Sequence, residues 1–145
     1  HSGGNIAAGL KSMNTKTITQ SVVLPARPAA VFAALMDGKQ HAAFTGDSAG
    51  IAPRAGGAFR CYGGYISGIT VELVRGKLIV QAWRSRGWPK GHYSLVTFAL
   101  SPAAGGKTKL RFTQLGVPAR DFQAKSAGWR SHYWTPLKQY LSAGG

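Results

Sequence analysis

The sequence is short of cysteine, of acidic side chains and of long hydrophobic runs. Its single cysteine, Cys61, excludes an internal disulfide and any metal cluster built from several cysteines, and it is typical of a reducing compartment. No apolar run reaches the roughly 18 residues that a transmembrane helix needs. We therefore predict a cytoplasmic protein without membrane insertion.

Acidic residues, which many catalytic and metal-binding sites require, are few in this sequence. The chain has 4 Asp and Glu residues against 18 Lys and Arg residues. No two carboxylates are spaced as a general acid–base pair. His41, His92 and His132 have neither metal-ligand spacing nor a carboxylate beside them. We expect no metal and no cofactor.

The formal net charge of +14 indicates acidic partners, among them nucleic acids, anionic membranes and acidic protein surfaces. The basic residues are scattered rather than gathered into an arm, and no RNP, KH or zinc-finger pattern is present. Specific nucleic-acid binding is therefore not predicted, although nonspecific adhesion at low salt is expected. The charge leaves the oligomeric state open.

A chain of 145 residues with 44% hydrophobic content has the size and the core of one ordinary domain. We predict a single domain over residues 13–145. Residues 1–12 are rich in Gly, Ala and Ser, match neither a signal peptide nor a folded element, and are expected to be disordered. Met13 is a candidate natural start, which would make the preceding residues a non-native addition.

The pattern of residues 128–141 predicts a C-terminal helix, and the rest of the predicted fold is arranged around it. Large apolar side chains recur every four residues across residues 128–141, with further aromatic residues beside them, so this helix must lie against a broad apolar surface. Gly128 is expected near the first turn because glycine weakens a helix interior. Pro136 lacks a backbone donor, which predicts a kink near residues 131–135.

Upstream of this helix, short β-type runs are separated by Gly and Pro, which predicts an antiparallel sheet. The first strand is expected at residues 17–24, followed by helices at 29–36 and 39–44. The later strands are expected at 49–52, 58–62, 66–74, 77–84, 94–101 and 107–115. Tight turns at 75–76 and 103–106 join neighbouring strands, so the pattern is a meander rather than a series of βαβ units.

Alternation gives this sheet one apolar face. Val96, Phe98 and Leu100 share one side of their strand, and Leu110 and Phe112 share one side of the next. The strands, two short helices after the first strand and the final helix predict an α+β helix-grip fold. In this fold a curved antiparallel sheet of about six to seven strands wraps around a long C-terminal helix.

The strand at residues 66–74 contains Glu72, which must face water. The residues of this strand that are then predicted to point inward are Ile69, Val71 and Leu73.

Several stretches of the chain resemble a known superfamily. They are Pro28–Leu35, Gly63–Gly68, Ile79–Arg84, Trp88–Pro89, His92–Phe98, Gly106–Leu110, Thr113–Pro118 and Gly128–Lys138. In matching order from about Thr17 to Leu141, they resemble the START-related SRPBCC superfamily, which has the helix-grip fold of the birch-pollen allergen. More narrowly, they are similar to the branch related to the C-terminal domain of the ATPase activator of the heat-shock chaperone.

The resemblance implies a cavity between the sheet and the long helix. In this superfamily some members bind hydrophobic small molecules there, some catalyse reactions there, and the namesake domain assists a chaperone through protein contacts. Aromatic side chains dominate the candidates for the cavity wall. The candidate ligand-binding residues are Phe59, Tyr65, Trp83, Trp88, Tyr93, Phe98, Phe112, Gln114, Trp129, Tyr133 and Trp134. The alternative interpretation is that these rings fill the core.

The residue pattern and the resemblance together lead to three functions. The first is noncatalytic binding of a hydrophobic or aromatic small molecule in the cavity. The second is a chaperone-associated accessory role through protein contacts, with a heat-shock chaperone as the partner. The third is a cyclase- or hydratase-type enzyme, for which His92, His132 and Tyr133 are the first candidates as proton donors. No residue is assigned a catalytic role.

Overall fold

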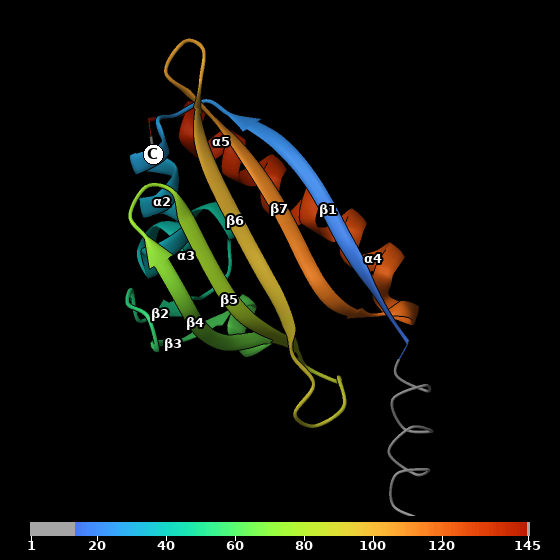
Figure 1. Cartoon of the computed structure of the whole chain (residues 1–145). Helices are drawn as coiled ribbons and strands as arrows, with labels where there is room; N and C mark the ends of the chain where they lie inside the picture. Colours follow the sequence, from blue (N-terminus) through green and yellow to red (C-terminus); the bar gives the residue numbers. More distant parts are fainter. Residues whose placement is uncertain (1–13, 145) are drawn as a thin grey trace, which may run out of the picture.

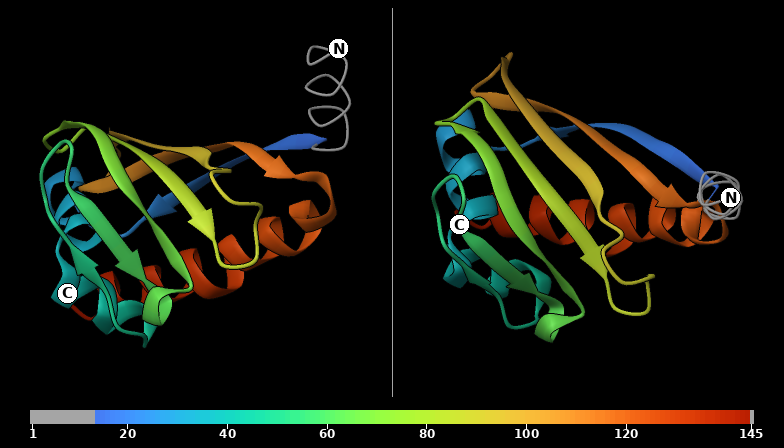
Figure 2. Two further views of the ribbon diagram at one scale, coloured as in Figure 1. Left: turned by 90° about the horizontal axis from the view of Figure 1, so that it is seen from below. Right: turned by 60° about the horizontal axis from the view of Figure 1, so that its bottom comes forward.

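The computed structural model describes residues 14–144, and the predictions made for residues 1–12 and for Met13 lie outside this range. One seven-stranded antiparallel sheet, with the strand order β1-β7-β6-β5-β4-β3-β2, forms the centre of the molecule (Figure 1). The sheet is curved and the helices lie on one side of it (Figure 2). The predicted α+β helix-grip fold is confirmed.

All the predicted strands are present. The first, sixth and seventh strands are two or three residues longer than predicted, and the ends of the other four differ from the prediction by at most one residue. The strands are β1 (Thr15–Leu24), β2 (Gly50–Ile51), β3 (Ala58–Cys61), β4 (Ile66–Val74), β5 (Leu78–Ser85), β6 (Ser94–Ala103) and β7 (Lys107–Pro118). The hairpin turns between β4 and β5 and between β6 and β7 contain Gly76 and Gly105, whose φ values of 71° and 79° lie in the left-handed region that glycine adopts without strain.

Two short helices, α2 (Pro28–Met36) and α3 (Gly38–Thr45), follow β1 as predicted. The proline at the start of α2 is compatible with a first helical turn, where its missing N–H is not needed. The Asp37 carboxylate caps α3 by accepting a hydrogen bond from the Lys39 backbone N–H at 3.2 Å. Gly46, with φ of 78°, ends α3 in a left-handed conformation.

The C-terminal helix is longer than predicted. It consists of α4 (Phe122–Gly128), a π-helical segment η3 (Trp129–Trp134) and α5 (Thr135–Ser142), preceded by a 3₁₀ turn, η2 (Ala119–Asp121). The expectation that Gly128 lies near the first turn is wrong, because α4 adds almost two turns before it. Packing against the sheet outweighs the weak helix propensity of one glycine.

The π-helical segment lies where the proline predicted a kink. Pro136 has no N–H to offer the carbonyl of His132, four residues earlier. The Tyr62 hydroxyl, from the 3₁₀ turn η1 (Tyr62–Gly64) after β3, donates to this carbonyl at 2.9 Å. A wider helical turn and a side-chain donor therefore accommodate the proline.

Two residues of β4 that were predicted to point inward, Ile69 and Val71, point to solvent instead. Ile69 and Val71 are exposed, whereas Thr70 is buried and Glu72 is exposed. The register between β4 and β5 shifts between Thr70 and Glu72, as in a β-bulge. This extra residue interrupts the alternation, so Leu73 packs against the core although Ile69 and Val71 do not.

The predicted apolar face of the other strands is confirmed. Phe98 and Phe112 lie opposite each other in the β6–β7 register and are fully buried. The C-terminal helix covers this face with Trp129, Leu137 and other buried side chains. In the described part of the chain, no helix is long and apolar enough to cross a membrane.

Candidate functional site

A pocket of about 360 Å³ lies between the C-terminal helix and the concave face of the sheet. It opens near the ends of β4 and β5, beside α4 and η3. Its lining residues are Tyr62, Tyr65, Ile66, Trp83, Ser85, Gln114, Asp121, Ala124, Lys125, Gly128, Trp129, His132 and Tyr133. The volume lies near the lower end of the range typical of small-molecule sites.

The inner wall of the pocket is aromatic because β5 and η3 place large rings in contact, tilted or edge-on to one another. The ring centroids of Trp83 and Trp129 are 4.9 Å apart, and those of Trp129 and Tyr133 are 4.8 Å apart. The π-helical turn brings Trp129, Tyr133 and Trp134 of one segment onto the same side of the helix. Such rings offer a flat apolar surface to a ligand.

Buried glutamines satisfy the indole groups of this wall. Trp129 Nε1 donates to Gln114 Oε1 at 2.7 Å, and Trp83 Nε1 donates to Gln81 Oε1 at 2.8 Å. The Gln114 amide in turn donates to Ser94 Oγ at 2.9 Å. Because the indole N–H groups are already paired within the protein, Trp83 and Trp129 offer a ligand their apolar ring surfaces and no free donor.

A buried polar group lies behind this wall. His41 Nε2 is 2.8 Å from the Tyr133 hydroxyl oxygen and 3.8 Å from Cys61 Sγ. Burial lowers the pKa of His41 to about 4 and raises the pKa of the Cys61 thiol to about 12. Burial also raises the pKa of Tyr133 well above its ordinary value. All three groups are therefore neutral near pH 7.

The mouth of the pocket contains a lysine between aromatic rings. Lys125 Nζ lies 4.9 Å from the centroid of the Tyr65 ring and 5.7 Å from a ring of Trp88. The same ammonium group donates a hydrogen bond to Ser85 Oγ. Asp121, one helical turn earlier, accepts a hydrogen bond from Trp88 Nε1 at 2.8 Å.

The predicted ligand-binding residues separate into three groups. Those that line the pocket are Tyr65, Trp83, Gln114, Trp129 and Tyr133. Those that are buried in the core without lining it are Phe59, Phe98, Phe112 and Trp134. Trp88 lies beside the mouth through its contact with Lys125, and Tyr93 is exposed and does not line the pocket.

Sequence reasoning did not single out His41, Ser85 or Lys125 as members of the site. His41 and Tyr133 are 92 positions apart, and only the packing of α3 against η3 brings them together. Lys125 lies on α4, before the predicted start of the helix. Had the helical pattern been extended from Gly128 to Phe122, Lys125 would have fallen one turn before Trp129.

The proton-donor candidates of the enzyme hypothesis occupy different environments. His132 is exposed and lines the pocket mouth, whereas His92 Nε2 lies 2.7 Å from the Gly116 carbonyl, away from the pocket lining. Tyr133 is buried against His41. Within residues 14–144, no group of three or more His, Cys, Asp and Glu side chains is arranged to hold a metal ion.

The fold and the pocket define a helix-grip protein of the SRPBCC type. Residues 25–142 match the family described as activator of Hsp90 ATPase homolog 1-like protein, and the chain belongs to this family. The crystal structure of an HSP90 activator from Plasmodium falciparum superposes with a TM-score of 0.82 at 23% identity, covering 87% of this chain and 96% of that one.

Two relatives with similar sequences are longer than this chain, and the match covers only part of each. The human activator of 90 kDa heat shock protein ATPase homolog 1 is 33% identical over 102 residues, which cover 70% of this chain and 30% of the human protein. A Schizosaccharomyces pombe protein is 30% identical over 132 residues, which cover 91% of this chain and 39% of the yeast protein. The chain thus spans about a third of the length of these relatives.

Proposed function

We propose that this domain is a chaperone-associated accessory protein that binds a 90 kDa heat-shock chaperone through direct protein contacts. Membership of the activator family carries this proposal, because the human relative is named for activating the ATPase of that chaperone. The chain matches a part of that relative, so we propose binding as the activity of this domain. Stimulation of the ATPase is measured as a second readout.

The outer face of the sheet supports a protein-binding role. In the strand register Ile69 lies opposite Ala82, Ala82 opposite Leu95, and Leu95 opposite Leu115. These four residues form an apolar row across β4, β5, β6 and β7, in which Ile69 is 48% exposed and Leu115 is 49% exposed. A continuous exposed apolar row is typical of an interaction surface.

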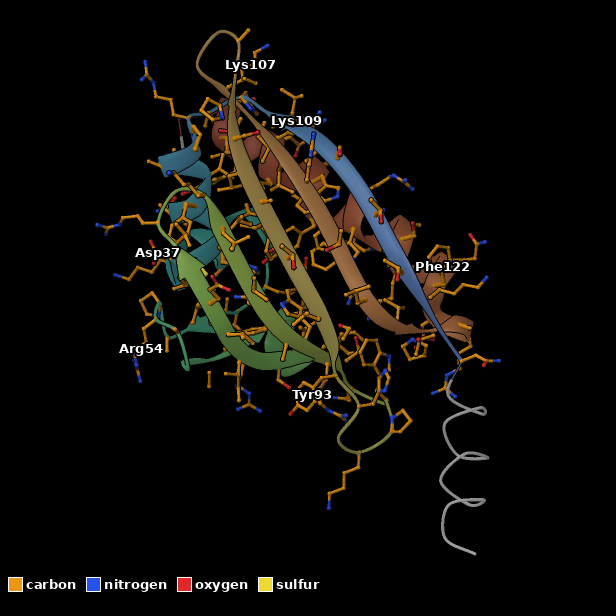
Figure 3. The ribbon with its side chains drawn as sticks, viewed as in Figure 1. Asp37, Arg54, Tyr93, Lys107, Lys109 and Phe122 are labelled. Carbon is orange, nitrogen blue, oxygen red and sulfur yellow. The ribbon has the colours of Figure 1, made fainter. Side chains whose placement is uncertain are left out.

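Basic side chains on the same face favour an acidic partner. Lys107, Lys109 and Arg111 are exposed and alternate along β7, and Figure 3 shows the two lysines toward the end of the sheet opposite Tyr93. Glu72 is the single carboxylate within the seven strands. An apolar row beside a basic stripe is complementary to a partner surface that combines acidic and apolar groups.

The test is isothermal titration of the domain into a purified 90 kDa heat-shock protein at near-physiological salt, with the ATPase rate measured alongside. We expect a saturable complex, and we expect Leu95→Ser combined with Leu115→Ser to weaken it by about tenfold or more. These side chains are exposed, so the variant should fold. Val74→Ser is the matched control, because Val74 is 42% exposed and lies at the end of β4, outside both the apolar row and the basic stripe.

Two results would count against this proposal. One is the absence of any complex at physiological salt. The other is equal affinity of the chaperone for the wild type and for the doubly substituted variant. That result would show that the chaperone does not bind at the apolar row.

The pocket supports a second candidate function, the binding of a hydrophobic or aromatic small molecule. Its volume of about 360 Å³ and its wall of Trp83, Trp129 and Tyr133 carry this candidate. Native mass spectrometry of the purified protein should show a bound molecule, or binding when aromatic compounds are added.

A pocket-filling variant sharpens this test. Gly128 lines the pocket, and a Cβ built on it would have one neighbouring atom at 4.0 Å, so Gly128→Leu should place its side chain in the pocket and abolish binding. Ala127→Leu changes the preceding, exposed position and should bind as the wild type does. Ligand binding that survives Gly128→Leu unchanged would exclude this pocket as the site.

A further inference from the structure

Lys125 differs from the other lysines of the chain. The other lysines within residues 14–144 are exposed, whereas Lys125 is partly buried on α4 and lines the pocket. Its ammonium group lies over the Tyr65 ring, faces Trp88 and donates to Ser85 Oγ. Cation–π contacts and one hydrogen bond partly replace the water that a lysine loses on burial.

We propose that the pocket binds a compact aromatic or otherwise apolar molecule that carries a carboxylate or a comparable anionic group, and that Lys125 pairs with this group at the mouth. This proposal rests on the small-molecule function proposed above and names the class of ligand for the same pocket. The apolar body of the ligand lies against Trp83 and Trp129, and its anionic group points toward α4.

The distribution of hydrogen-bond donors orients such a ligand. An ammonium group has three N–H donors, and Ser85 accepts from one of them. At the inner wall, the indole donors of Trp83 and Trp129 are already paired with glutamine oxygens. An anionic group on the ligand therefore finds a charged donor at the mouth, whereas the indole donors of the inner wall are occupied.

The charges around the mouth favour an anion. A Cβ built on Gly64 would lie 3.7 Å from Arg60 Nη2 and 3.8 Å from Arg86 Nη2, so two guanidinium groups reach the same point, one residue before the pocket-lining Tyr65. The Asp121 carboxylate also lines the pocket, but it accepts the indole N–H of Trp88. Asp47 acts on the Tyr62 side of the pocket, so the local balance is three cations against two carboxylates.

Burial and charge act on Lys125 in opposite directions. Burial lowers the pKa of Lys125, and the attraction of Asp121 opposes this effect without cancelling it. Burial removes water that would stabilise the charge of the ammonium group. An anionic ligand at the mouth would stabilise that charge in place of the water.

Two fluorescent probes with the same aromatic body test the proposal. Anilinonaphthalene sulfonate carries an anionic group, and N-phenylnaphthylamine lacks one. Each is titrated into the full chain, with energy transfer from the tryptophans of the pocket wall as the signal. We expect the wild type to bind the sulfonate at least about tenfold more tightly than the uncharged probe, as a charge-assisted hydrogen bond implies.

Substitution of the lysine isolates its contribution. Lys125→Met keeps most of the length of the side chain and removes the charge, so affinity for the sulfonate should fall by about tenfold while affinity for the uncharged probe is retained. Lys90→Met is the control for the general positive charge, because Lys90 is exposed and does not line the pocket. Thermal unfolding of both variants shows that each is folded.

The possible outcomes separate this proposal from the one on which it rests. If neither probe binds the wild type, the small-molecule function itself fails. The proposal of an anionic ligand is wrong if both probes bind equally, or if Lys90→Met weakens sulfonate binding as much as Lys125→Met does. In either case the pocket would still be a binding site for apolar molecules.

Discussion

At the scale of single residues, His41 is a buried group whose ordinary pKa lies closest to neutral and whose protonation the fold opposes. Its side chain is 1% exposed, its Nε2 contacts the Tyr133 hydroxyl, and its Nδ1 has no hydrogen-bond partner among the described residues. A protonated imidazole would add an unsatisfied N–H and a charge to an apolar environment. The neutral imidazole is therefore a condition for the packing of α3 against η3.

This burial predicts how stability depends on pH. The pKa of His41 falls from 6.5 to about 4 on folding, so between these pH values the unfolded chain binds a proton at His41 and the folded chain does not. The free energy of unfolding should therefore rise with pH across this interval, by about 3 kcal/mol in total. Urea unfolding at a series of pH values measures this change.

The matched variant for this prediction is His41→Gln, which cannot be protonated. It should be less stable than the wild type at pH 7, and its free energy of unfolding should depend much less on pH between 4 and 6.5. With 4 carboxylates in the whole chain, acid titration adds less to this interval than in an ordinary protein. An unchanged pH dependence in the variant would show that another group is responsible.

At the scale of secondary-structure elements, the packing of β3, β4 and β5 depends on Gly68. This residue lies opposite Phe59 in β3 and opposite Trp83 in β5. A Cβ built on it would lie 1.8 Å from the Ala82 carbonyl oxygen and 2.7 Å from Phe59 Cζ. The bare backbone at this position lets the Phe59 ring lie across the strand and against Trp83, at 5.6 Å between ring centroids.

Gly68→Ala should therefore destabilise the fold strongly. Because the first atom that a Cβ meets is backbone, the strands themselves must move, and we expect a loss of at least about 3 kcal/mol in the free energy of unfolding. Chemical denaturation measures the change. Gly50→Ala is the control, since a Cβ there meets nothing within 4 Å, and its effect should stay within about 0.5 kcal/mol. Equal stability of the two variants would contradict the packing argument.

At the scale of the whole molecule, the net charge of +14 acts on the folded state as self-repulsion. The exposed stripe of Lys107, Lys109 and Arg111 on β7 concentrates three of these charges at alternate positions of one strand. The same positive field that favours an acidic partner therefore opposes compaction. A partner surface, an anionic ligand or salt reduces this repulsion.

Salt should accordingly raise the melting temperature. Between about 0.02 M and 0.3 M sodium chloride, screening shortens the range of charge repulsion, and we expect an increase of about 3 °C or more. Replacing Lys107, Lys109 and Arg111 together by Gln should reduce this increase. A melting temperature that falls as salt is added would show that attractive ion pairs outweigh repulsion in this fold. Differential scanning calorimetry measures both proteins.

Most of the fold was predictable because its signals are local. Alternation placed Phe98 and Phe112 on the buried face, and four-residue spacing placed Trp129 and Leu137 on the helix that covers it. The prediction was wrong where one extra residue in β4 interrupts the alternation, which exposes Ile69. A bulge depends on pairing with the neighbouring strand, and a single strand's sequence does not contain that information.

The pocket was predictable in part. Its aromatic wall follows from residues that had to face the sheet, and Trp83, Trp129 and Tyr133 were among the predicted ligand-binding residues. At its mouth Tyr65 and Trp88 were predicted, but Ser85 and Lys125 were not, because these two come from elements 40 positions apart and neither belongs to a recognisable motif.

By itself, the sequence determined that this protein is basic, poor in carboxylates and built as a curved antiparallel sheet under an aromatic helix. Periodicity and composition carry that information because each depends on near neighbours along the chain. Tertiary structure alone decided that His41 is buried beside Tyr133 and that Lys125 enters an aromatic pocket mouth. The burial and the charge environment of these side chains depend on elements distant in the chain, and they exist only once the helix has packed against the sheet.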